Sequence, residues 1–170
     1  LAVLFPASQL RILPYNRCVE DLKDSTEEKF LAAVRAQFEV RADATAAPQE
    51  PGHVCMYLNR RWYELGWPAA AASAGASGLD VSVLQDRLLA PILGIDDPRA
   101  DERIQFVGGI RGTAELSDRV DSGQAAVAFS MYPTQVDQMM AIADAGEIMP
   151  PKSTWFEPKL RSGLFVHTLE

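Results

Sequence analysis

The stretch VCMYLNRRWYEL, residues 54–65, predicts a β-hairpin and so decides the class of the fold. Residues 54–58 and 62–65 are two short runs rich in β-branched and aromatic side chains, and the polar pair Asn59-Arg60 supplies the turn. Two such runs around a two-residue turn are the usual pattern of antiparallel strands. This hairpin argues against an all-parallel, doubly wound sheet.

The segments on either side of the hairpin add helices and further strands. Upstream, the capping-box pattern Ser25-Thr26-Glu27-Glu28 and the helical spacing of the apolar residues after it predict a helix over residues 26–37. Downstream, apolar spacing predicts a helix from Asp80 towards Gly94, which Pro91 could kink or end. The same patterns predict helices at 113–120 and 134–146, and strands at 1–5, 10–13, 103–107, 125–131 and 164–168. We therefore expect an α+β fold, with three to four helices packed on a mixed, partly antiparallel sheet.

The chain is expected to form a single domain over residues 1–168. Its 170 residues are 48% hydrophobic, which is enough for one substantial core. Residues 41–52 and 68–78 lack large periodic apolar side chains, so flexible loops are predicted there. The opening LAVLF is strand-like and lacks Met, which suggests a C-terminal domain cut from a longer protein, and residues 169–170 are interpreted as a cloning scar.

Composition argues against several classes of function. The chain has 23 acidic and 16 basic side chains and a net charge of -7, so its surface repels nucleic acids. It lacks an apolar run of roughly 18 residues, so no membrane span is expected. The two cysteines, Cys18 and Cys55, are not in CxxC spacing and are interpreted as small buried apolar residues. A cytoplasmic, reducing location fits these features best.

A short segment near the C-terminus concentrates side chains that suit an anion. Within eight residues it carries two cations and two hydroxyls, and prolines restrict the backbone around them: Lys152, Ser153, Thr154 and Lys159. It is not a nucleotide-binding P-loop, because GxxxxGK[ST] is absent. The alternative is a solvated loop that Trp155 and Phe156 anchor to the core.

Other candidate anion-binding residues lie at expected strand ends. Asn16 and Arg17 follow the strand at 10–13, and Arg17 could bind an anion bidentately or form a salt bridge with Glu20 or Asp21. Arg103 precedes a glycine pair, Gly108-Gly109, where a ligand could approach the backbone. The acidic loop at 96–102 could hold Mg²⁺, but a solvated, ion-paired loop is the favoured interpretation. The two histidines are far apart and have no ligand motif, so no metal site is predicted.

Four stretches together resemble the family known as domain of unknown function 1015. They are LFPASQLRILPYNR, LLAPILGIDDPRADERIQFVGG, AFSMYPTQVDQMM and MPPKSTWFEPKLRSGLF, in the order and spacing of the C-terminal part of that family. The resemblance implies a protein roughly twice as long as this chain. It also implies an N-terminal half that resembles the ParB-like fold of a serine kinase and carries an Asp-Gly-His-His-Arg motif, which is absent here.

The function expected from these observations is therefore shared with a second domain. The chain would supply anion-contacting residues to a site that its own N-terminal domain completes, with a phosphorylated small molecule as the ligand. The resemblance implies a small-molecule phosphotransferase or phosphatase linked to serine metabolism, with Mg²⁺ and a nucleotide as cofactors of the full-length protein, and this chain alone would be inactive. No catalytic residue is assigned. The alternative is a non-catalytic structural or protein-interaction module.

Overall fold

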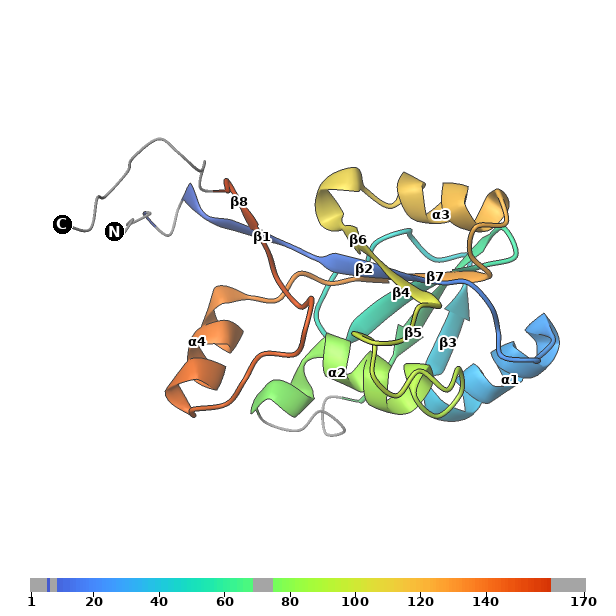
Figure 1. Ribbon diagram of the computed structural model, residues 1–170, viewed down its shortest axis with the longest axis horizontal. Helices are drawn as coiled ribbons and strands as arrows, with labels where there is room; N and C mark the ends of the chain where they lie inside the picture. The colour runs from blue at the N-terminus through green and yellow to red at the C-terminus, as the bar shows by residue number, and fades with distance from the viewer. Residues whose placement is uncertain (1–5, 7–8, 69–74, 160–170) are drawn as a thin grey trace.

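The computed structural model describes residues 6, 9–68 and 75–159, and at its centre is a six-stranded sheet (Figure 1). The strand order is β3-β5-β4-β7-β2-β6, and every pair of neighbours is antiparallel. The strands are β2 (Tyr15–Val19), β3 (Glu39–Ala42), β4 (His53–Leu58), β5 (Arg61–Gly66), β6 (Ile104–Gly108) and β7 (Val127–Met131). Together with the helices, this sheet confirms the expected α+β class.

The predicted hairpin is confirmed as β4 and β5. Asn59 and Arg60 form its turn, and both have positive φ angles, 47° and 61°. A two-residue hairpin turn with two positive φ angles matches the right-handed twist of the flanking strands. Across the hairpin, the rings of Tyr57 and Trp62 are 4.9 Å apart between centroids, so these aromatic residues stabilise the strand pair.

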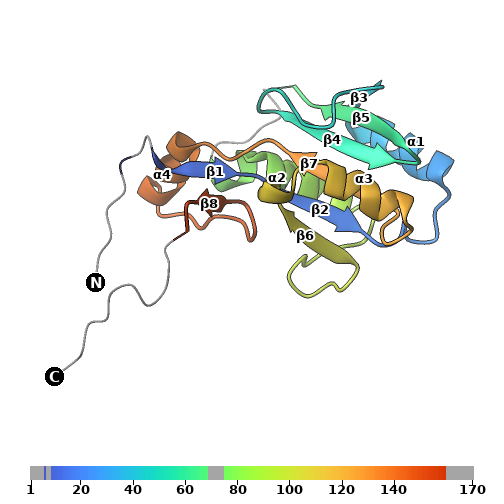
Figure 2. The ribbon, with the colours of Figure 1, turned by 90° about the horizontal axis from the view of Figure 1, so that it is seen from above.

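Helices cover both faces of the sheet (Figures 1 and 2). On one face lie α1 (Glu27–Gln37) and α2 (Asp80–Leu84), which continues as a π-helical turn over Gln85–Leu89. On the other face α3 (Ala114–Asp121) crosses β2 and β7. Side chains alternate along β7, so Phe129 belongs to the larger core under α1 and α2, and Ala128 to the smaller core under α3.

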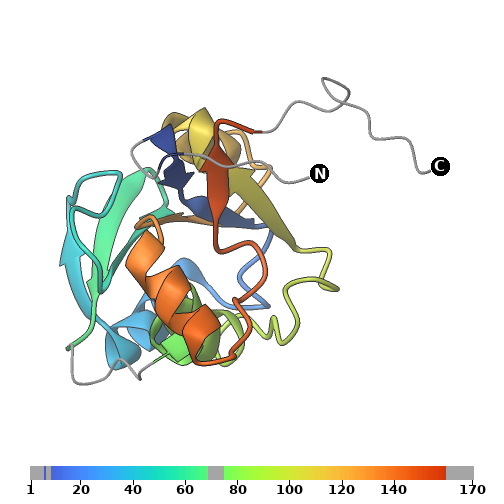
Figure 3. The ribbon, with the colours of Figure 1, turned by 90° about the vertical axis from the view of Figure 1, so that its left-hand side faces the viewer.

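A smaller unit lies at one end of the molecule. It consists of the two-stranded antiparallel sheet of β1 (Arg11–Leu13) and β8 (Trp155–Glu157), with α4 (Val136–Asp144) beside it (Figure 3). The strand expected at 10–13 is thus confirmed, whereas β8 was not expected. Gln135, and not Thr134, caps α4, because the side chains of Gln135 and Gln138 form a reciprocal capping box.

Some sequence predictions differ from the structure, and others fall outside the residues that it describes. Asn16 and Arg17 were expected in a loop after a strand, but they lie inside β2, between β7 and β6. That prediction was wrong because two polar residues in YNRCV conceal the strand pattern. The strands expected at 1–5 and 164–168 lie outside the described residues, as does 69–74 of the expected 68–78 loop, whereas Gly75–Gly78 form a 3-10 helix.

No helix in the described part of the chain has both the length and the apolar character needed to cross a bilayer.

Candidate functional site

Arg17 occupies the most unusual environment of the predicted site residues. It lies in β2 opposite Phe106 of β6, its exposed fraction is 4%, and the central guanidinium carbon is 5.5 Å from the centroid of the Phe106 ring. Arginine is rarely buried to this degree unless a carboxylate neutralises it. The partners of this side chain therefore decide how it is interpreted.

No carboxylate pairs with Arg17 among the ion pairs of the described residues. Of the two partners considered from the sequence, Asp21 pairs with Arg103 and Glu20 accepts a hydrogen bond from Gln105. Arg17 instead donates to two backbone carbonyl oxygens, that of Tyr15 and, at 3.3 Å, that of Lys152.

Burial lowers the pKa of Arg17 from its usual value to about 10. This direction means that the protein environment disfavours the charged form, and the shift corresponds to roughly 3 kcal/mol. At neutral pH the guanidinium is nevertheless protonated. The fold thus holds a buried positive charge whose partners among the described residues are two neutral carbonyl groups and the Phe106 ring, which offset less of the desolvation cost than an anion would.

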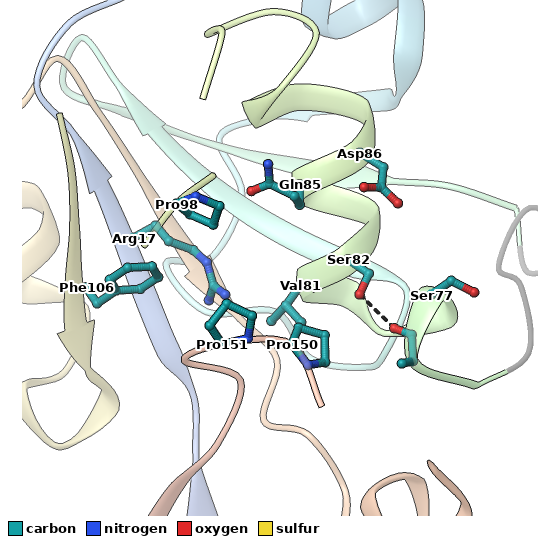
Figure 4. Close-up of a pocket in the computed structure, with 11 residues that line it drawn as sticks. Arg17, Ser77, Val81, Ser82, Gln85, Asp86, Pro98, Phe106, Pro150 and Pro151 are labelled. Atoms are coloured by element: carbon teal, nitrogen blue, oxygen red, sulfur yellow. Dashed lines mark hydrogen bonds between the residues drawn. The ribbon is translucent and has the colours of Figure 1, made fainter. Parts of the chain in front are cut away.

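The guanidinium faces a cavity of about 190 Å³ (Figure 4). One wall is formed by α2 and the π-helical turn, and the opposite side by Pro150 and Pro151. The full lining consists of Arg17, Ala76, Ser77, Val81, Ser82, Gln85, Asp86, Pro98, Phe106, Pro150 and Pro151. Proline, valine and phenylalanine exclude water from part of this space, which strengthens any electrostatic interaction with Arg17.

The polar groups of the cavity are held in place by backbone contacts. The Ser82 hydroxyl donates to the carbonyl of Ala76 at 2.7 Å, and the Gln85 amide donates to the carbonyl of Ile95 at 2.7 Å. Asp86 is the other charged lining residue, and it is exposed. These donors of Ser82 and Gln85 are therefore taken by the backbone, so the buried Arg17 guanidinium is the group through which the cavity could hold a small anion.

The segment that contains the predicted lysines passes along this cavity. Lys152 is exposed, and its ammonium lies 5.4 Å from the centroid of the Tyr15 ring, while its carbonyl faces Arg17. Ser153 is buried, and its hydroxyl donates to the carbonyl of Pro150 at 2.8 Å, so this hydroxyl already has a partner. The hydrogen bond from Arg17 to the Lys152 carbonyl places the backbone of this segment beside the guanidinium, whereas the Lys152 ammonium lies over the Tyr15 ring.

Thr154 and Lys159 border a second, more open cavity of about 460 Å³. Its lining consists of Leu10, Tyr15, Thr154, Trp155, Phe156, Pro158 and Lys159. The Lys159 ammonium lies 3.7 Å from the centroid of the Trp155 ring, and the Tyr15 and Trp155 rings are 5.1 Å apart. Since Tyr15 and Arg17 lie two residues apart on β2, the two cavities flank the same strand.

Three other predicted residues have clear packing roles. The Asn16 side-chain oxygen accepts a hydrogen bond from the Met131 amide at 3.0 Å, which joins β2 to the end of β7. A Cβ atom at Gly108 would overlap the Trp155 ring, and one at Gly109 would lie 2.7 Å from the Pro14 carbonyl oxygen. The close approach expected at this glycine pair is thus made by the protein's own chain.

Arg103 lies in a different network. Its guanidinium pairs with Asp101 at 2.7 Å and Asp21 at 3.3 Å, and donates to the carbonyls of Leu93 and Gly94. It thereby binds carbonyl groups just after the helical segment of α2, where orphan carbonyls need donors. We place Arg103 outside the proposed anion site.

Sequence inspection missed the residues that α2 and β6 contribute to the cavity. Ser82 and Gln85 are polar positions among apolar core residues of a helix, which is a weak signal, and Phe106 looks like any apolar strand residue. Gln85 begins the π-helical turn, a feature that is frequent at functional sites. The described residues contain no group of three or more His, Cys, Asp or Glu side chains placed to hold a metal ion.

The sequence and the fold both have known counterparts. The family model described as "Protein of unknown function (DUF1015)" matches residues 1–82, so the resemblance seen in the sequence is confirmed over that part of the chain. No curated protein sequence matches the chain. Several solved structures share its fold.

One of them is a free serine kinase in complex with AMP, with a TM-score of 0.53 and 12% identity over 88% of this chain and 55% of that chain. A conserved hypothetical protein from Pyrococcus furiosus has a TM-score of 0.52 and 14% identity, over 87% of this chain and 56% of its own. SbnI from Staphylococcus aureus, with a C-terminal truncation, has a TM-score of 0.51 and 14% identity, over 90% and 52%. The chain therefore spans little more than half of these relatives, and at such identities the likeness concerns the fold alone.

Proposed function

We propose that the Arg17 cavity binds the phosphate, or a similar anionic group, of a small molecule. In this proposal the chain supplies the anion-contacting part of a site that a second domain of a longer protein completes. The observation that carries the proposal is the burial of Arg17 without a carboxylate partner, facing a cavity. A bound anion would supply the counter-charge that the described structure lacks.

The physical properties of the site support a small ligand group. A guanidinium presents donors in a planar fork that matches phosphate or carboxylate oxygens, and such charge-assisted bonds are roughly twice as strong as those to carbonyls. The cavity of about 190 Å³ is smaller than the roughly 300–1,000 Å³ typical of sites for drug-sized ligands. It suits a phosphate with a short carbon chain better than an entire nucleotide. The ammonium of Lys152 adds positive charge near this site, and that of Lys159 lies at the neighbouring cavity.

The sharper form of the proposal is a phosphotransferase or phosphatase that acts on a small molecule of serine metabolism. The shared fold with a free serine kinase solved with AMP supports it, as does the family resemblance. A nucleotide and Mg²⁺ would then be held largely by the part of a longer protein that this chain does not cover. The catalytic residues would lie there too.

The decisive experiment compares ligand affinity in two variants with the same change of charge. Calorimetry on the full-length protein would measure dissociation constants for inorganic phosphate, phosphoserine and AMP. Arg17→Met should weaken phosphate and phosphoserine binding at least about tenfold, since one buried charge-assisted bond contributes about 1.5–3 kcal/mol. Arg111→Met is the matched control, because Arg111 is exposed and pairs only with Glu115 among the ion pairs of the described residues. Equal affinities of Arg17→Met and the wild type would contradict the proposal.

A second candidate function is a non-catalytic interaction module. The observation that favours it is the exposure of two large apolar side chains in and just after α4, with exposed fractions of 55% for Met140 and 88% for Ile148. This function would become the better supported one if Arg17→Met bound every ligand normally while a Met140→Lys/Ile148→Lys variant changed the assembly state in sedimentation.

A further inference from the structure

Lys152 has a backbone conformation that its side chain disfavours. Its φ angle is 53°, in the left-handed region, where the Cβ atom of an L-residue crowds its own carbonyl. Two prolines precede Lys152, and its side chain is exposed, so packing of the side chain does not explain the strain. The carbonyl group that this conformation orients is the one that accepts the hydrogen bond from Arg17.

Hydrogen bonds fix the residues on both sides of Lys152, whereas the hydrogen bond to the Lys152 carbonyl is long. On one side the Ser153 hydroxyl holds the Pro150 carbonyl at 2.8 Å, and on the other the Thr134 hydroxyl donates to the Ser153 carbonyl at 3.0 Å. The bond from Arg17 to the Lys152 carbonyl is longer, at 3.3 Å, beyond the usual range for such bonds. A change at Lys152 could therefore occur without unfolding the segment around it.

We infer that the Lys152 carbonyl competes with an anion for Arg17 and that Lys152 is a backbone switch for anion binding. This inference rests on the proposed function of the Arg17 cavity. An anion bound to the guanidinium brings electron-rich oxygens beside the Lys152 carbonyl oxygen, which accepts from one terminal nitrogen of Arg17, and these oxygens repel one another. The carbonyl turns away, and Lys152 leaves the left-handed region.

Both Arg17 and Lys152 reach a more favourable state when an anion replaces the Lys152 carbonyl at the guanidinium. Arg17 replaces a long bond to a neutral carbonyl with charge-assisted bonds to an anion. Lys152 loses the strain of a left-handed conformation, which a residue with a Cβ atom adopts at a cost. Its ammonium is exposed in the present state and keeps its hydration during the change. Lys152 is thus a positioning residue for the site, in addition to any charge that it contributes.

Glycine and alanine variants separate the backbone effect from the charge. Lys152→Gly and Lys152→Ala both remove the ammonium, but glycine stabilises the left-handed conformation. The affinity of the full-length protein for inorganic phosphate should be on the order of fivefold weaker, or more, in Lys152→Gly than in Lys152→Ala. Lys23 has a φ angle of 50° and is exposed, so the pair Lys23→Gly and Lys23→Ala is the matched control and should show equal affinities.

A second measurement needs no variant. Amide hydrogen exchange at Lys152, Ser153 and Thr154 in the wild-type protein should change when inorganic phosphate is added, and exchange in the 59–60 turn should not. The switch would be overturned if Lys152→Gly bound phosphate as tightly as Lys152→Ala or more tightly, or if exchange at residues 152–154 stayed unchanged while phosphate was bound. If either result were found while Arg17→Met still weakened phosphate binding, the proposed function would stand without the switch. Absence of phosphate binding in the wild type would remove both.

Discussion

Arg17 and Lys152 are separated by 135 positions in the sequence and meet in a hydrogen bond from a buried guanidinium to a backbone carbonyl. This contact connects a central strand of the main sheet with the segment that leads into β8. It forms one side of the cavity in which we place anion binding. Stability, as well as ligand affinity, should reflect the cost of keeping the Arg17 charge buried.

In the absence of phosphate, Arg17→Met should not destabilise the protein and should stabilise it by up to about 3 kcal/mol, because methionine fills the apolar part of the space without burying a charge. Chemical denaturation in phosphate-free buffer at neutral pH measures the difference in free energy of unfolding. Burial holds the folded pKa of Arg17, about 10, below its value in the unfolded chain. The penalty is therefore complete below pH 10 and declines as the pH rises from about 10 towards the unfolded pKa, so the advantage of the variant should shrink there.

A clear loss of stability in Arg17→Met would show that the carbonyl bonds outweigh the desolvation of the guanidinium. Inorganic phosphate provides an internal control, because it should raise the free energy of unfolding of the wild type and leave that of the variant unchanged.

Asp80→Asn should stabilise the protein at neutral pH and have little effect in acid. Burial, as the largest cause, raises the pKa of Asp80 from 3.8 to about 6, although the bond from the Gly52 amide and the charge of His53 oppose the shift. The folded state thus binds the proton more tightly than the unfolded state does, and its stability falls as the pH rises from about 4 to 6. Asparagine can still accept the bond from Gly52 without a charge.

Denaturation of wild type and Asp80→Asn at pH 4 and pH 7.5 measures this effect. The gain at pH 7.5 should be on the order of 2 kcal/mol and should be nearly absent at pH 4. A gain of equal size at both pH values would mean that the ionisation of Asp80 is not its source.

Asn16→Ala should lower the free energy of unfolding by about 1–3 kcal/mol, because it leaves the Met131 amide without its acceptor in a buried site. Both residues are buried, with exposed fractions of 2%. Thermal unfolding followed by circular dichroism measures the loss. Glu102→Ala, at an exposed position just before the neighbouring strand β6, is the control and should stay within about 0.5 kcal/mol of the wild type.

Gly108→Ala should destabilise the packing of the smaller β1–β8 sheet on the main sheet, because the new methyl group would overlap the Trp155 ring. Overpacking of this kind costs about 1–3 kcal/mol. Trp155→Leu should lose stability on its own but should accept alanine at position 108 with a smaller additional cost. A double-mutant cycle on the free energy of unfolding tests this coupling, and strictly additive effects would count against direct contact.

Local sequence patterns determined the hairpin of β4 and β5, helix α1 and the α+β class, because turn residues, caps and apolar spacing act over a few neighbouring positions. The positive charge of their side chains also marked Arg17 and Lys152 as candidate anion-binding residues. They could not reveal that Arg17 lies within β2, because its polar neighbour Asn16 is satisfied by Met131, 115 positions away.

Tertiary structure alone decided what surrounds these residues. The cavity exists only where β2, β6, α2 and the segment at 150–153 pack together, and burial there turns an ordinary arginine into a charge without a counter-ion. Tertiary contacts likewise gave Arg103 two carboxylate partners, whereas Arg17 has no carboxylate partner in the part of the chain that the structure describes. Burial and the distances between charges depend on residues far apart in the chain, so no local pattern could have predicted them.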